Sequence, residues 1–390
     1  MSKGTVIKLK PIESTDPETK VQVINFTSNL SDSRHPYFTQ NLFTRDGDAM
    51  VISSRVNGDW QLFLLRFNEN EAVQLTEDPG GTPPSKPCLD AIHNVVYYWA
   101  KGGVLKRVHI SDLSDEIIYK IPRGFNGSIL SCSSDGNYVA FAYSEVLKDR
   151  FTEFQVRESF KLSMFLKPRS IIVRLNTASN ESDVVWGESE WITHVNINPV
   201  DPNEILFNHE GPWFMVQRMH IIRADTYEYW PLYVQRRLIE MIGHEFFTND
   251  GRVIAQYGRR SRPGSGDWVY YDMFINPDGS GLRLFKYPGP KPGHIKANST
   301  AKIVVGDRGY LTSDFKDGDK YIALIRYDES ELKVNMMLLC RHDSSWVNDA
   351  HPHPIFTPND EYIVFTSDKG RKLNVYLCNV KDKAKELGWL

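Results

Sequence analysis

The sequence lacks several features that would place it in large classes of protein. Its 390 residues include four cysteines without a C-x-x-C pair, which argues against a disulfide framework or a cysteine zinc site: Cys88, Cys132, Cys340 and Cys378. No run approaches the ~18 apolar residues of a membrane span. The first residues, M-S-K-G-T-V, have no apolar run, so we expect no secretory leader. We therefore expect buried, reduced thiols in a cytoplasmic protein that has no membrane partner.

The chain also lacks an excess of charge of either sign. Its formal net charge is −3 at pH 7, so we expect no nucleic-acid partner. A phosphate-binding glycine loop, a dinucleotide fingerprint and the nucleophile motif G-x-S-x-G are absent as well. Nucleotide-dependent enzymes and α/β-hydrolases are therefore disfavoured.

What the chain does contain is a repeated strand–turn–strand pattern. Residues 43–65 and 356–377 both have a turn rich in Asp, Asn and Gly, then an alternating apolar strand, a short loop and a second strand. Weaker copies begin near Leu89, Ser133, Asn198, Thr248 and Asn298. A period of about 40–50 residues with short strands is typical of a β-propeller. We expect an all-β, seven-bladed propeller forming a single domain over residues 1–390, with an N-terminal strand that completes the last blade.

Three segments interrupt the repeat. Residues 145–165 have helix-like spacing of apolar side chains, residues 229–241 are expected to be partly helical, and residues 307–318 are polar with glycine. We expect these short insertions on one face of the ring, where insertions usually line a binding site. The alternative is that the repeats are ordinary hairpins of two separate β domains.

Two histidines near the C-terminus are each followed by proline, in H-P-H-P at residues 351–354. A residue before proline favours an extended conformation. Side chains two apart in an extended chain share a side. His351 and His353 are therefore expected to present both imidazoles to one place, either in a metal site or by accident in a polar loop.

Histidines recur at one position of the repeat. His244, His294 and His353 each precede a repeat turn by four residues, and equivalent positions in a propeller lie around the central channel. A lone histidine is more often structural, but several in phase favour a shared site. Three imidazoles suit Mn, Fe, Co, Ni or Zn. Asn348 could add an oxygen ligand, which would leave His244 as a base.

Three motifs resemble the oligogalacturonate lyase family: H-E-G-P-W at 209–213, G-H-E-F-F-T-N-D-G at 243–251 and H-P-H-P-I-F-T-P-N-D at 351–360. The resemblance covers nearly the whole chain. It implies a seven-bladed propeller that is intracellular and cleaves short pectic oligomers by β-elimination. It also implies a divalent metal cofactor, most often Mn²⁺, and an acidic oligosaccharide as the binding partner.

The resemblance assigns a metal site. His294, His351 and His353 match the three metal histidines of the family, and Asn348 sits where the family carries a glutamine ligand.

The same resemblance assigns catalytic and substrate-binding roles. His244 matches the histidine that abstracts the proton, and Arg218 matches the active-site arginine. His209, Arg45 and Tyr257 are further candidates for substrate binding.

Other functions remain open on sequence grounds. The same fold and chemistry would suit a lyase that acts on another uronate-containing saccharide. A non-catalytic propeller that binds a protein or glycan, and a metal-dependent hydrolase, are the alternatives from other classes. The sequence indicates no oligomeric state.

Overall fold

The regular secondary structure of the described residues consists almost entirely of antiparallel strands. The computed structural model describes residues 1–147, 163–289, 291–308, 320–347, 350–386 and 388. Helix is confined in this part to a single turn at 163–166 and to α2 (Lys381–Glu386). None of the described helices has the length and apolar character needed to cross a membrane. The all-β prediction is confirmed.

The chain divides into two compact units. Unit 1 comprises Met1–Val96, Val108–Asp115 and Pro288–Leu390, and unit 2 comprises Tyr97–Arg107 and Glu116–Tyr287. The boundary runs through β9 (Val95–Ala100), β10 (Val104–His109) and β11 (Asp115–Lys120).

Unit 1 contains three runs of paired strands. The first has the order β1 (Val6–Lys8), β7 (Glu71–Gln74), β6 (Asp59–Arg66), β5 (Ala49–Val56), β4 (Ser33–Arg34). The second has the order β2 (Ile12–Thr15), β3 (Gln22–Asn25), β30 (Asn374–Asn379), β29 (Tyr362–Ser367), β28 (Ile355–Phe356). The third has the order β27 (Lys333–Arg341), β26 (Tyr321–Asp328), β25 (Ile303–Asp307), β24 (Ile295–Ala297), and β8 (Cys88–Asp90) also lies in this unit.

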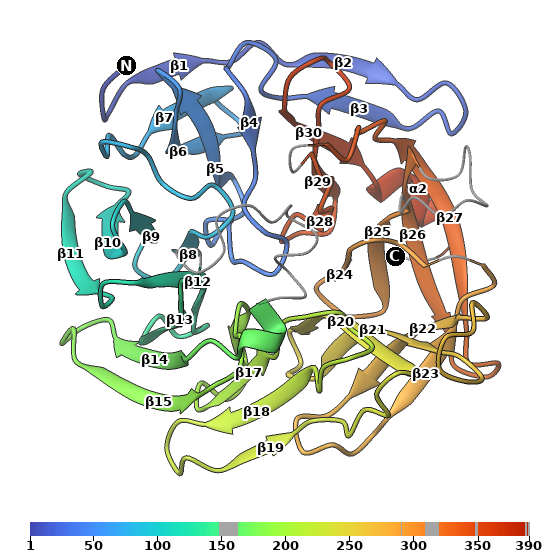
Figure 1. Cartoon of the computed structure of the whole chain (residues 1–390). Coiled ribbons are helices and arrows are strands. Elements are labelled where there is room, and N and C mark those ends of the chain that lie inside the picture. Colours follow the sequence, from blue (N-terminus) through green and yellow to red (C-terminus); the bar gives the residue numbers. More distant parts are fainter. Residues whose placement is uncertain (148–162, 290, 309–319, 348–349, 387, 389–390) are drawn as a thin grey trace. The chain divides into compact units, whose positions relative to one another are not determined.

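The two ends of the chain meet in one sheet of unit 1. Val23 of β3 pairs with Cys378 of β30, so the N-terminal strands β2 and β3, drawn in blue, lie beside β30, drawn in red (Figure 1). Side chains from both ends and from the preceding strands share a buried core that includes Val23, Ile322, Ile363 and Phe365. Packing of this kind removes apolar surface from water and fixes which sheets are neighbours.

Unit 2 contains three further runs of four strands. The first has the order β12 (Phe125–Cys132), β13 (Tyr138–Glu145), β14 (Ser170–Asn176), β15 (Ser182–Glu188). The second has the order β16 (Val195–Ile197), β17 (Glu204–Asn208), β18 (Met219–Arg223), β19 (Tyr229–Pro231). The third has the order β20 (Glu240–Phe247), β21 (Val253–Arg259), β22 (Val269–Ile275), β23 (Arg283–Lys286). Inner strands such as β17 are buried, whereas an outer strand such as β15 is largely exposed.

The turns of the sequence repeat connect the first two strands of each run. The turns at 133–136, 198–203 and 248–251 join β12 to β13, β16 to β17 and β20 to β21. Asn57 and Gly58, both with positive φ, make the tight connection between β5 and β6. The residues of the turns therefore determine where the hairpins form, and these turns could be predicted from the sequence.

The expected helical insertions are corrected in part. Residues 229–241 hold β19, a turn and the start of β20, so the prediction of helix there is wrong. Strand pairing overrode the local preference, because His220 and Ile222 of β18 pair with β19. Of the segment 145–165, a helical turn is seen at 163–166, while 148–162 lie outside the described residues, as do 309–319 in the third insertion.

Candidate active site

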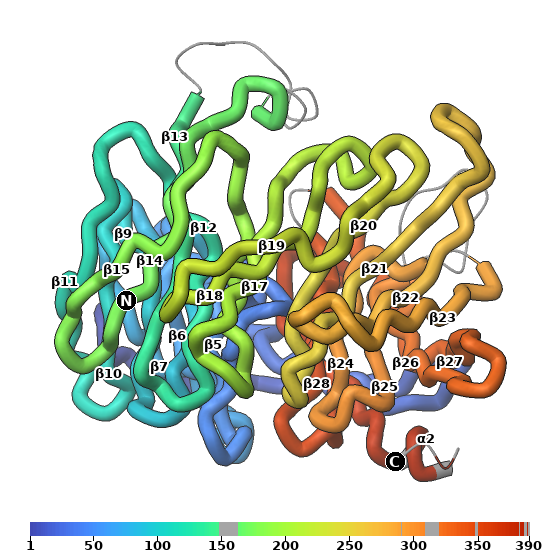
Figure 2. The backbone as a smooth tube through the Cα atoms, turned by 90° about the horizontal axis from the view of Figure 1, so that it is seen from below, coloured from blue at the N-terminus to red at the C-terminus, as the bar shows by residue number. Residues whose placement is uncertain are grey.

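Three predicted metal histidines lie together in unit 1. His294 immediately precedes β24, and His351 and His353 precede β28, a strand that contacts β24 (Figure 2). One ligand atom from each imidazole falls within 4.8 Å of the others. The contact between β24 and β28 thus brings together residues that are more than fifty positions apart in the chain.

The backbone of the H-P-H-P segment differs from the extended path expected from the sequence. His353 has φ +46°, in the left-handed region that non-glycine residues rarely adopt, so the prediction of extended chain is wrong there. Its ring nevertheless lies 5.5 Å from that of His351, measured between centroids. Such strained residues persist where the surrounding structure holds them, and they concentrate at functional sites.

Asp307, at the end of β25, orients the cluster. Its Oδ2 lies 2.8 Å from Nδ1 of His294, and its carboxylate also accepts the backbone N–H groups of His294 and His353. A proton held on Nδ1 leaves the Nε2 of His294 as the atom with the lone pair. A carboxylate bonded to the far nitrogen of a histidine is the usual support of a metal ligand.

The geometry of the imidazoles fits a bound cation. The Nε2 atoms of His294 and His353 lie 3.2 Å apart. Two nitrogens each ~2.0–2.1 Å from one ion would be about 2.8–3.0 Å apart in octahedral geometry and about 3.3–3.4 Å apart in tetrahedral geometry. Burial, together with the neighbouring His294, Arg34 and His351, lowers the pKa of His353 well below its usual value, so the ring is neutral, as a metal ligand must be. Burial raises the pKa of Asp307 to about 7, against the opposing backbone hydrogen bonds.

Aromatic rings enclose the cluster, and sequence analysis missed them. The ring of Phe38 lies 5.5 Å from that of His294 and 5.8 Å from that of His353, and Trp346 lies 5.0 Å from His351. The repeat of the sequence could have pointed to Phe38. Phe38 precedes Phe43 by five residues, as His351 precedes Phe356 in the matching repeat. Surroundings of low polarity, such as aromatic rings, strengthen electrostatic interactions.

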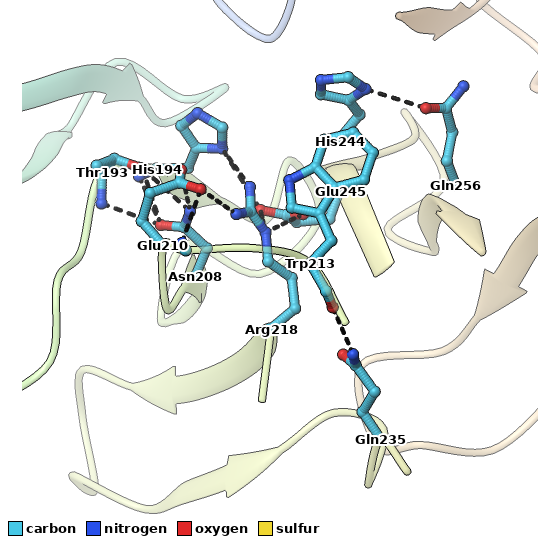
Figure 3. A network of polar contacts seen from close by, with 11 residues as sticks. Thr193, His194, Asn208, Glu210, Trp213, Arg218, Gln235, His244, Glu245 and Gln256 are labelled. Atoms are coloured by element: carbon cyan, nitrogen blue, oxygen red, sulfur yellow. Dashed lines mark hydrogen bonds and ion pairs between the residues drawn. The ribbon is translucent and has the colours of Figure 1, made fainter. Parts of the chain in front are cut away.

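His244 sits on an irregular stretch of β20 in unit 2. The pairing of β20 with β21 shifts between Gly243 and Phe246, and His244 has φ +55°. A bulge of this kind re-aims a side chain. Its Nδ1 lies 3.0 Å from Oε1 of the buried Gln256, and the ring of Trp213 packs edge-on at 4.7 Å (Figure 3). If Nδ1 donates to the amide oxygen, Nε2 is the basic nitrogen.

Arg218 is held between two carboxylates. It donates from Nη1 to Glu210 (2.6 Å) and from Nε to Glu245 (3.0 Å), and its side chain is 1% exposed. His194 lies 3.4 Å from both Arg218 and Glu245 (Figure 3). Burial alone would raise the pKa of Glu245, but the charge of Arg218 and the contacts with His194 lower it to about 2. The Nε and Nη1 donors of the arginine are therefore already used within unit 2.

This buried pair predicts a specific pH dependence of stability. A carboxyl whose pKa falls from 4.5 to about 2 on folding stabilises the protein above pH 4.5, and that contribution is lost as pH falls toward 2. The loss amounts to about 2 kcal/mol between roughly pH 6 and 3. We expect Glu245→Gln to flatten this part of the curve, as measured by urea unfolding at both pH values. The exposed Glu69→Gln is the control, and an unchanged slope in Glu245→Gln would contradict the assignment.

The remaining candidates are distributed over both units. Tyr257 is 2% exposed, donates to Glu240 (2.9 Å), and follows Gln256 on β21, so it points to the opposite face from the partner of His244. His209 accepts or donates at Nε2 with Glu188 (2.7 Å) and lines a cavity of unit 2.

Arg45 does not join the histidine cluster. Arg45 is exposed in the turn before β5, where Gly47 packs against Pro358. Pro358 follows β28 and His353 precedes it, so this turn lies at the other end of the strand from the histidines. Asn348 lies outside the described residues.

Comparison with known proteins places these features in a family. The family model described as oligogalacturonate lyase matches residues 1–384. The chain is 26% identical to an oligogalacturonide lyase of Pectobacterium atrosepticum, with 98% of this chain and 99% of that protein aligned. It is also 26% identical to an oligogalacturonate lyase of Dickeya dadantii over the same shares.

Two solved structures are similar to this chain along almost its whole length. An oligogalacturonate lyase in complex with manganese is 26% identical, with a TM-score of 0.85 over 97% of this chain and 98% of that one. An oligogalacturonate lyase from Vibrio parahaemolyticus is 25% identical, with a TM-score of 0.84 over 97% and 99% of the two chains.

Proposed function

Because the chain belongs to the oligogalacturonate lyase family, we propose that it cleaves short oligogalacturonides by β-elimination with a divalent cation, Mn²⁺, as cofactor. The observation that carries the proposal is the convergence of His294, His351 and His353, whose ligand atoms lie within 4.8 Å of one another. The solved relative that contains manganese supports the choice of metal. We further propose Asn348 as an oxygen ligand.

The finer description of the fold is also a proposal. A single seven-bladed propeller over residues 1–390 is supported by the repeat of the sequence and by the similarity to lyase structures along 97% of the chain. A cytoplasmic location fits the composition and the absence of a cysteine framework.

The chemistry follows from the substrate. The hydrogen on C5 of a galacturonate lies next to the C6 carboxylate, and its removal builds negative charge on that group. A divalent cation, when bound, stabilises this charge as a Lewis acid. His244 serves as the general base that takes the C5 proton on Nε2. The electron pair of the C5–H bond forms the C4=C5 double bond as the C4–O bond breaks. The leaving oxygen keeps the bonding pair and takes up a proton to become a hydroxyl, which gives a 4,5-unsaturated uronate with no net consumption of water.

Neighbouring side chains prepare His244 for this role. Gln256 fixes its tautomer, and the indole of Trp213 limits the rotation of the ring. Arg218 holds Glu245, the next residue on the irregular stretch of β20. We propose that the arginine acts mainly by positioning this stretch.

The products test the proposal. Incubation with trigalacturonate and Mn²⁺ is expected to raise the ultraviolet absorbance of an unsaturated uronate, and mass spectrometry should show fragments that sum to the substrate. Fragments heavier by one water would indicate a hydrolase. Cleavage of another uronate, with trigalacturonate left intact, would reassign the substrate.

A further inference from the structure

A cavity in unit 2 has the size and lining of a ligand site and has no role in the chemistry above. Its volume is about 430 Å³, within the range of ~300–1,000 Å³ usual for small-molecule sites. Its walls come from β18, β19, the helical turn at 163–166 with the residue that follows it, and the loop that follows Gly211.

In the part of the chain that the structure describes, one ring nitrogen and one cation of the cavity lack partners. His220 is 2% exposed, and its Nδ1 makes no hydrogen bond with any described residue. Arg237 is exposed at the rim and forms no ion pair with a described residue. Buried polar atoms are nearly always paired, so the imidazole calls for a polar ligand or a water.

The other charges at the cavity are balanced. Glu190 pairs with Lys167, and Glu188, behind the wall, is bonded to His209 at 2.7 Å. Burial lowers the pKa of His220 to about 2, so that ring is neutral. Arg237 therefore remains as the one unbalanced cation among the described lining residues. A ligand with one carboxylate and several hydroxyl groups matches this arrangement.

Several rings that line the cavity pack against one another. Tyr229 and His220 stack with their planes 13° apart, and the ring of His209 lies 4.0 Å from that of His220. Their polar edges suit a saccharide, whose hydroxyls can reach them.

One loop connects the cavity to His244. Val216 and Gln217 line the cavity, and Trp213, three residues earlier than Val216, packs on His244. The loop is closely packed at both Trp213 and Val216. A Cβ on Gly243 would lie 2.6 Å from the indole of Trp213, and a Cβ on Gly211 would lie 2.7 Å from Val216. The same loop therefore contacts both His244 and the cavity.

We propose that the cavity binds a galacturonate residue of the substrate that lies away from the bond being cleaved, with the carboxylate on Arg237 and the hydroxyls at His220. The inference rests on the proposed function. It predicts that the enzyme distinguishes longer oligomers from the dimer through this cavity.

The test compares KM for digalacturonate, trigalacturonate and tetragalacturonate. Arg237→Ala is expected to raise KM for tetragalacturonate about 10-fold, the usual effect of losing a charged hydrogen bond, while KM for digalacturonate and kcat stay unchanged. His220→Phe keeps the stacked ring, removes the nitrogen, and should change KM in the same direction. Arg262→Ala removes an exposed arginine elsewhere in unit 2 and is the matched control.

The outcomes separate the two proposals. Equal KM in wild type and Arg237→Ala for every length, or an equal rise for all lengths, would overturn the cavity as a distal subsite while the lyase function stands. If wild type cleaves no oligogalacturonide, the proposed function fails. Calorimetric titration with tetragalacturonate then decides the cavity by itself: weaker binding to Arg237→Ala than to Arg262→Ala supports it, and equal binding rejects it.

Discussion

Replacement of His294 with alanine is expected to remove bound metal and lyase activity together. The imidazole supplies one of three converging donors, and its Nε2 lies 3.2 Å from that of His353. Its loss leaves only two nitrogen donors for the cation. It also leaves the Asp307 carboxylate without its imidazole partner. We expect metal content, measured by atomic emission on gel-filtered protein, to fall to background, with activity at the limit of detection.

The control is a histidine that lies outside the cluster. His93 is 53% exposed and pairs with Asp90, so His93→Ala should retain both metal and activity. Full metal content in His294→Ala would show that the cation is held elsewhere, and full activity without metal would remove the cation from the chemistry.

The second large effect is expected from His244→Asn. Asparagine tolerates the left-handed backbone better than alanine does, so the φ of +55° at this position is preserved while the base is removed. Loss of general-base catalysis is typically worth about 10²–10⁴ in rate. We expect kcat on trigalacturonate to fall by that factor with metal content unchanged.

Tyr257→Phe tests whether such an effect is specific. Tyr257 is the neighbour of Gln256 on β21, is buried, and bonds to Glu240 on the face away from His244. The Tyr257→Phe substitution should reduce the stability of the protein modestly and leave kcat near the wild-type value. A His244→Asn enzyme with normal kcat would reject the assignment of the base.

Much of the fold could be predicted from the sequence, because turns and the alternation of apolar residues in strands depend on neighbouring residues. The pairs Asn57-Gly58 and Asp250-Gly251 lie in turns between strands, as expected from their chemistry. Residues 229–241 could not be predicted in the same way. Their strand depends on pairing with β18, which local propensity does not encode.

The candidate site was predictable where it depends on repeat phase. His294 and His353 share a position before their turns, and they do come together. Asp307 was not found, because its contact with His294 crosses from β25 to the start of β24 and a lone aspartate carries no signal. The left-handed φ of His353 and the burial of Arg218 between Glu210 and Glu245 are tertiary effects that only the packed chain reveals.

Metal dependence of the elimination tests the central claim most directly. Protein stripped with EDTA would be titrated with Mn²⁺ while bound metal and unsaturated product are both followed. We predict no product from the stripped protein, and a rate that rises in step with occupancy and saturates at one cation per chain. Undiminished formation of the unsaturated product by metal-free protein would contradict the account.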